Sequence, residues 1–264
     1  MIDQGIAQVN GAALHYRIEG PEGGTPVVFA NSLGTDFRTW DKVVAALPEA
    51  RVLRYDKRGH GLSDDPDTGW SMAELVGDAA ALMDYFQMKN ACFVGLSVGG
   101  IIAQGLAAER PDLMRLMVLC DTAARIGNAD LWNTRIHAVE TGGIAAIADG
   151  ILERWFSKPF FDDPSFPMWR NMLIRQSDRG YARVSAAIRD TDFLESTARL
   201  TLPTLVVVGA HDGATPPDLV RDTANLITGA QFHVIKGAGH IPCVEQPVVF
   251  TQLLRQFMSD YGSL

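Results

Sequence analysis

Five residues, Gly95-Leu96-Ser97-Val98-Gly99, place a serine between two glycines at the end of an apolar run that predicts a buried strand. Helix-forming residues follow at once, so Ser97 stands at a strand-to-helix turn. Such a turn is sharp enough to require small neighbours, and it raises the hydroxyl above the end of the strand, where a nucleophile is needed. We expect Ser97 to attack a carbonyl carbon; the alternative is a glycine-rich helix start.

A serine hydroxyl is a weak nucleophile until a base takes its proton. Of the six histidines, His240 is the best candidate, because it ends a glycine-rich loop after the last predicted strand. Asp212 follows an earlier strand and would hold the ring in one tautomer and stabilise the imidazolium. Asp121, which also follows a strand, is the rival acid.

Attack on a carbonyl creates an oxyanion, which needs two backbone donors. We predict that these are the N–H groups of Val98, next to the nucleophile, and of Leu33, in the loop after the third strand. Ser32 in that loop is either a substrate contact or a turn residue. The polar segment of residues 55–64 is interpreted as structural, with Asp56 and Arg58 forming local hydrogen bonds.

The elements that must position these residues alternate between buried strands and helices, which predicts a mostly parallel sheet covered on both faces. Asn10-Gly11 indicates a hairpin within residues 1–20. Six apolar runs predict further strands, and the intervening segments predict helices. The strands are Pro26–Ala30, Arg51–Tyr55, Ala91–Leu96, Leu116–Cys120, Thr204–Val208 and Gln231–Ile235, and the helices are Phe37–Ala46, Met72–Phe86, Val98–Glu109, Pro217–Ile227 and Val248–Tyr261.

About eighty residues after the sixth strand have helical periodicity and no buried strand pattern. We expect them to form a helical lid inserted into the sheet domain. Residues 123–202 would then be the lid, and residues 1–122 with 203–264 would be the α/β core. The predicted lid helices are Asp130–Glu140, Ile144–Phe156, Phe166–Gln176 and Tyr181–Asp190.

The formal net charge of −8 and the absence of a Lys/Arg run argue against a nucleic acid partner. Three cysteines in apolar stretches suit reduced thiols, and we expect a cytoplasmic protein without a leader or a membrane span. Cys243 lies close to His240 and is a second conceivable nucleophile, but we interpret it as a packing residue.

The order Ser97, Asp212, His240 and its strand context resemble the α/β-hydrolase superfamily over almost the whole chain. The fold implied is an eight-stranded, mostly parallel sheet with helices on both faces and an inserted helical lid. Within the superfamily, residues 31–36, 53–61 and 131–136 are similar to the 3-oxoadipate enol-lactonases of bacterial aromatic catabolism, the β-ketoadipate pathway. Asn31-Ser32 stands where many other relatives carry His-Gly.

This resemblance implies hydrolysis of an enol-lactone to 3-oxoadipate through an acyl-enzyme, with neither metal nor cofactor. Such a lactone is a small anion whose carboxylate needs a cationic partner. Arg135 is our candidate, with Trp132 on the same helix face; the alternative is that Trp132 packs the lid and Arg135 pairs with a surface acid. The sequence leaves the oligomeric state open.

The sequence is also compatible with other functions. A carboxylesterase or a C–C bond hydrolase would use the same triad, because specificity belongs to the lid. A hydrolase-like receptor that binds a lactone without sustained turnover belongs to a different class of protein. A cofactor-free haloperoxidase or perhydrolase activity would be a side reaction.

Overall fold

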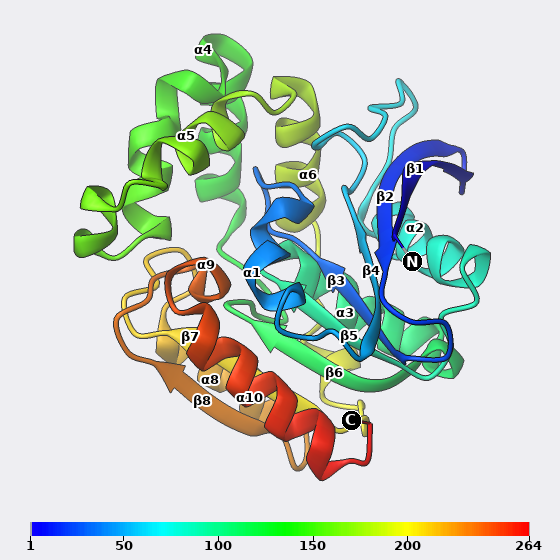
Figure 1. Cartoon of the computed structure of the whole chain (residues 1–264). Helices are drawn as coiled ribbons and strands as arrows, with labels where there is room; N and C mark the ends of the chain where they lie inside the picture. The colour runs from blue at the N-terminus through cyan, green and yellow to red at the C-terminus, as the bar shows by residue number, and fades with distance from the viewer. Residues whose placement is uncertain (1, 264) are drawn as a thin grey trace.

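Eight strands form one sheet in the computed structural model, which describes residues 2–263 (Figure 1). The spatial order is β1-β2-β4-β3-β5-β6-β7-β8; β2 runs antiparallel to β1 and β4, and the remaining neighbours are parallel. The predicted hairpin included Met1, which lies outside the described residues. The strands are β1 (Ile2–Val9), β2 (Ala12–Glu19), β3 (Thr25–Ala30), β4 (Ala50–Tyr55), β5 (Ala91–Leu96), β6 (Met114–Cys120), β7 (Thr204–Gly209) and β8 (Gln231–Ile235).

The central strands are continuous apolar runs because both of their faces are covered. Every residue of β5 and of β7 is buried, as expected for parallel strands between two helical layers. At the edge, β1 and β2 join through Asn10-Gly11, and both residues have positive φ angles, 48° and 72°. Asparagine and glycine tolerate these angles, which explains the tight turn.

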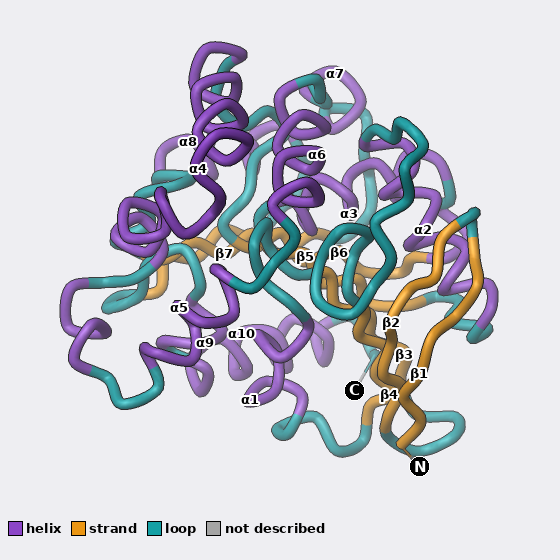
Figure 2. Tube along the Cα trace, turned by 90° about the horizontal axis from the view of Figure 1, so that it is seen from above, coloured by secondary structure: helices purple, strands orange, loops and turns teal. Residues whose placement is uncertain are grey.

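Helices cover the two faces of the sheet, and Figure 2 shows the strands as a band between them. On one face lie α1 (Asp41–Val44), α9 (Pro242–Glu245) and α10 (Pro247–Asp260), preceded by the 3₁₀ turn η1 (Phe37–Trp40). On the other face lie α2 (Met72–Tyr85), α3 (Val98–Glu109) and α8 (Pro217–Leu226). The 3₁₀ turn η2 (Pro111–Leu113) links α3 to β6.

Between β6 and β7 the chain forms helices, and we call residues 123–202 the cap segment. Figure 1 shows α4, α5 and α6 gathered at one end of the sheet. Gly143 has a φ of 71° and interrupts α4, at the Gly142-Gly143 pair where the sequence predicted a break. The elements are α4 (Ala129–Trp155), η3 (Lys158–Asp162), α5 (Phe166–Ile174), α6 (Asp178–Arg189) and α7 (Leu194–Thr197).

The strand order places two loops side by side. From β3 the chain crosses to β4 on one side, and from β5 it crosses to β6 on the other. Connections that diverge in this way leave a crevice at the carboxyl ends of the strands, which is where open α/β sheets bind ligands. Because Ala30 of β3 pairs with Gly95 of β5, the loop after β3 begins next to the turn at Ser97. Within residues 2–263, no helix has the length and apolarity needed to cross a membrane.

Candidate active site

The backbone at Ser97 has a conformation that residues other than glycine rarely adopt. Ser97 has φ 57° and ψ −117°, a strained region for a residue with a Cβ. Its glycines make room for this: a Cβ at Gly95 would lie 2.2 Å from the Gly99 carbonyl oxygen, and a Cβ at Gly99 would lie 2.1 Å from the Ala30 carbonyl oxygen. The glycine spacing seen in the sequence is therefore a steric requirement.

Hydrogen bonds fix this turn from both sides. The Ser97 N–H donates to the Cys120 carbonyl at 2.9 Å, and the Thr122 hydroxyl donates to the Ser97 carbonyl at 2.6 Å. Val98 is the first residue of α3, and the first N–H groups of a helix have no acceptor within the helix. The Val98 N–H therefore has the position expected of an oxyanion donor.

Asp212 and His240 meet in the loops after β7 and β8. The His240 Nδ1 lies 2.9 Å from Asp212 Oδ2. Asp212 also accepts from the N–H groups of Ala214 and Thr215, and from the Thr215 hydroxyl at 2.7 Å. Burial alone would raise the pKa of Asp212, but the charge and hydrogen bond of His240 and the Thr215 hydroxyl outweigh it, and the pKa is lowered. This environment favours the ionised form of Asp212, with the carboxylate in hydrogen-bond contact with the imidazole.

The rival acid, Asp121, lies beside Asp212 with a different environment. It accepts from the Gly209 N–H at 2.8 Å and from the Cys120 thiol. Burial, and then the negative charge of Asp212, raise the pKa of Asp121 well above its ordinary value. The environment of Asp121 thus favours its protonated form, and Asp212 is the acid that contacts the imidazole.

The loops that carry Asp212 and His240 are tied to the last turn of α4. The His240 N–H donates to the Trp155 carbonyl at 2.7 Å, and the Gly213 N–H donates to the Arg154 carbonyl at 3.1 Å. Helix C-termini leave such carbonyls without partners inside the helix. The cap segment therefore fixes the positions of both loops.

A cavity of about 100 Å³ lies where these loops, the β3 loop and the cap segment meet. It brings together six of the eight residues predicted from the sequence; Asp212, which contacts the imidazole, and Val98 do not line it. Within residues 2–263, no hydrogen bond joins Ser97 to His240, although both line this cavity; such bonds often tighten only when substrate is bound. The six residues are Ser32, Leu33, Ser97, Trp132, Arg135 and His240.

The cap side of the cavity is basic. The Arg135 guanidinium lies over the Trp132 ring, 4.8 Å from its centroid, while the Trp132 indole N–H donates to the Ile126 carbonyl at 2.7 Å. Trp132 therefore packs the cap and also carries Arg135 on its face. Arg154 lines the same cavity, and burial, followed by the charge of Arg135, lowers its pKa.

The sequence did not single out Arg154 or Thr215. Thr215 follows Asp212 by three residues, a spacing typical of local Asp and Thr turn hydrogen bonds, and this signal was available. Arg154 lies nineteen residues after Arg135 on a helix interrupted at Gly143, so no periodicity connects the two arginines. Only the folded structure brings them to one cavity.

The second conceivable nucleophile, Cys243, is fully buried in α9. Burial, and then the charge of Asp121, raise the pKa of its thiol well above the ordinary value, which makes it a poor nucleophile. Packing is therefore its role here.

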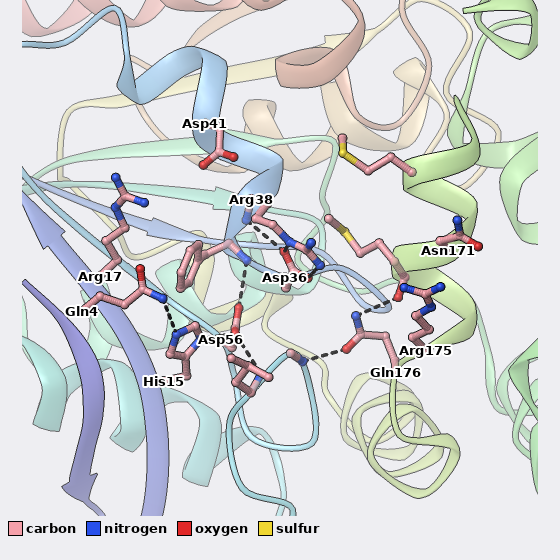
Figure 3. A pocket seen from close by; sticks show the side chains of 15 residues that line it. Gln4, His15, Arg17, Asp36, Arg38, Asp41, Asp56, Asn171, Arg175 and Gln176 are labelled. Carbon is pink, nitrogen blue, oxygen red and sulfur yellow. Dashed lines mark hydrogen bonds and ion pairs between the residues drawn. The ribbon is translucent and has the colours of Figure 1, made fainter. Parts of the chain in front are cut away.

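A larger groove of about 810 Å³ lies elsewhere, between β2, η1 and α5 (Figure 3). Most of its charged side chains already have partners. Arg38 pairs with Asp36, and His15 Nδ1 lies 2.7 Å from Asp56 Oδ2. None of the three predicted triad residues lines it. Its size therefore does not make it a candidate for catalysis.

Comparison with known proteins identifies the family. Residues 27–253 match the model of the alpha/beta hydrolase family. The chain is 34% identical to 3-oxoadipate enol-lactonase 1 of Acinetobacter baylyi over 259 residues, 97% of this chain and 96% of that protein. It is 32% identical to 3-oxoadipate enol-lactonase 2 of the same organism over 253 residues, covering 95% and 94%.

Among solved structures, the enol-lactonase of Burkholderia xenovorans LB400 is similar with a TM-score of 0.93 and 38% identity, covering 97% of this chain and all of that one. The chain therefore belongs to the alpha/beta hydrolase family and is a hydrolase. The fold class predicted from the sequence is confirmed.

The turn at Ser97 yields a stability prediction. Gly99→Ala should lower the free energy of unfolding by at least about 2 kcal/mol, because the new methyl group would overlap the Ala30 carbonyl. Gly150→Ala is the matched control: Gly150 lies on α4 with open space around it, and alanine there should stabilise by up to about 1 kcal/mol. Urea denaturation measures both. Equal effects of the two substitutions would contradict the steric account.

Substitution of Asp212 and of Asp121 should affect kcat to very different extents. Asp212→Asn should lower kcat for an ester by about 10³- to 10⁴-fold, because the amide no longer holds the required tautomer, whereas Asp121→Asn should stay within about threefold. Steady-state kinetics on the folded variants measures this. A larger loss for Asp121→Asn would exchange the roles of the two acids.

The raised pKa of Asp121 also gives a pH dependence. A folded-state pKa above the unfolded value of about 3.9 means that stability is lost as the pH rises from about 4 through the folded pKa. Asparagine does not titrate. The Tm of Asp121→Asn relative to wild type should therefore increase as the pH rises above about 4. A difference that is constant with pH would show that Asp121 is not held neutral.

Proposed function

We propose that this hydrolase opens 3-oxoadipate enol-lactone to 3-oxoadipate by a Ser97-His240-Asp212 triad. The observation that carries the proposal is the cavity in which Ser97 and His240 face two arginines. A neutral ester needs a nucleophile and a base but no cation. A lactone with a free carboxylate needs a cation in addition to the nucleophile and the base, and this cavity contains all three kinds of group.

The charge of the cavity supports an anionic substrate. Arg135 and Arg154 line it, and none of its lining residues within the described part of the chain is acidic. Neither arginine forms a salt bridge within residues 2–263. Two unpaired cations in a partly buried site repel one another, and a bound carboxylate would relieve that repulsion through charge-assisted hydrogen bonds. The relatives named for enol-lactone hydrolysis support the same choice.

In the proposed reaction, Ser97 Oγ attacks the lactone carbonyl carbon while His240 Nε2 takes the hydroxyl proton. The N–H groups of Leu33 and Val98 hold the oxyanion. The ring C–O bond then breaks, and the enolate, which remains attached through the chain of the substrate, receives a proton from His240. A water molecule deprotonated by His240 next attacks the acyl-Ser97 ester. The acyl C–O bond breaks, the proton on His240 returns to Ser97 Oγ, and the released enol tautomerises to 3-oxoadipate.

Turnover of the lactone tests the proposal directly. Wild-type protein should abolish the ultraviolet absorbance of freshly generated 3-oxoadipate enol-lactone with multiple turnovers, because the enol-lactone chromophore is lost on opening. Ser97→Ala should not. Hydrolysis of simple aryl esters without lactone turnover would indicate a carboxylesterase instead. Binding of the lactone without turnover would indicate a receptor.

The arginines should determine affinity for the carboxylate. Arg135→Met and Arg154→Met should each raise KM for the lactone about 10- to 100-fold through loss of a charged hydrogen bond. Neither should change KM for a neutral aryl ester by a comparable factor. Arg175→Met is the control, because Arg175 is exposed and lines the separate groove of Figure 3. An equal rise in KM for both substrates would remove the proposed contact.

A further inference from the structure

A buried lysine binds the loop that carries the proposed oxyanion donor. Lys57 follows β4 with 1% of its surface exposed, and its Nζ donates to the Ser32 carbonyl at 2.6 Å. Within the described residues it forms no salt bridge of its own. A buried ammonium without a directly bonded carboxylate is unfavourable for folding, so its presence needs another explanation.

The Ser32 carbonyl and the Leu33 N–H belong to one rigid peptide group. In a trans peptide the carbonyl and the N–H point in opposite directions. A donor that fixes the carbonyl therefore also fixes the direction of the N–H. The same carbonyl accepts from the Thr35 N–H at 3.3 Å and from the Thr35 hydroxyl at 3.0 Å, and neither bond is charged.

Neighbours of Lys57 hold the loop at two further points. The Gly34 N–H donates to His60 Nε2 at 2.9 Å, and the Phe37 N–H donates to Asp56 Oδ1 at 2.9 Å. Figure 3 shows Asp56 among the residues of the adjacent groove. The Leu33 N–H is not used in any of these bonds. The loop is thus fixed around a donor that none of these bonds uses, in a residue that lines the same cavity as Ser97.

We propose that Lys57 is a positioning residue for the oxyanion hole, which orients the Ser32–Leu33 peptide and strengthens its N–H as a donor. This inference rests on the proposed acyl transfer by Ser97. Lys57 does not line the cavity, so it acts through the peptide and not on the substrate. A donor polarises the peptide it binds, most strongly while it is protonated, and the opposite N–H becomes more positive.

The energetic state of Lys57 agrees with this role. Burial lowers the pKa of Lys57 to about 7, against the opposing charges of Asp56 and Asp36. A group that is unfavourably buried yet bonded to a loop of the candidate active site is typical of a residue retained for activity at a cost in stability. Removing it should therefore harm catalysis without harming the fold.

The test is Lys57→Met, assayed with p-nitrophenyl acetate, a neutral ester that does not depend on the lactone assignment. We expect kcat to fall about 10- to 100-fold with little change in KM, since a misdirected oxyanion donor weakens transition-state binding alone. Affinity for an alkyl trifluoromethyl ketone, whose adduct carries the oxyanion, should fall by the same factor. The Tm should stay equal or rise, because methionine replaces a buried charge.

Arg58→Lys is the matched control, since Arg58 is the adjacent buried cation and pairs with Asp78 through two bonds of 2.6 and 2.5 Å. It should lower Tm and leave kcat and the ketone affinity unchanged. An unchanged kcat in Lys57→Met, or a loss of kcat not matched by the ketone, would overturn the role of Lys57. Ester hydrolysis that survives in Ser97→Ala would instead overturn the proposed triad, and this inference with it.

Discussion

The turn between β5 and α3 is the constraint on which the rest of the site depends. Ser97 adopts a positive φ angle. Gly95 and Gly99 permit the tight turn because the Gly99 and Ala30 carbonyl groups occupy the space that their Cβ atoms would need. Since Ala30 ends the neighbouring strand β3, the same packing that raises the serine brings the β3 loop alongside it. The proposed nucleophile and the proposed oxyanion loop are thus positioned by one contact between adjacent strands.

The cap segment is part of this arrangement as well as a cover over it. Carbonyls at the end of α4 bind the Gly213 and His240 N–H groups, and the Arg154 side chain of the same turn lines the cavity. One helix end therefore holds the loops of Asp212 and His240 while it places a cation in the cavity proposed to bind substrate. Changes in the cap that alter specificity would also move catalytic groups, so the two properties are physically coupled.

Much of this was accessible from the sequence, because strong local rules determine it. The buried runs of β5 and β7, the Asn10-Gly11 hairpin and the glycines around Ser97 each follow from a steric or solvation rule that acts over a few residues. In the 55–64 segment, the local bonds of Asp56 were expected and are present, but the long-range contacts were not accessible. Arg58 was expected to bond locally, yet it pairs with Asp78 of α2, and such partners depend on how distant elements pack. Arg154 was missed for the same reason.

The central claim is that Ser97 becomes covalently acylated during hydrolysis of the lactone. Protein quenched in acid during turnover, digested and analysed by mass spectrometry measures this directly. Because opening a lactone keeps the leaving oxygen attached, the account predicts a peptide containing Ser97 that is heavier by the whole mass of the lactone, and no such adduct in Ser97→Ala. An adduct on another residue, or sustained turnover with no adduct on Ser97 at any quench time, would contradict it.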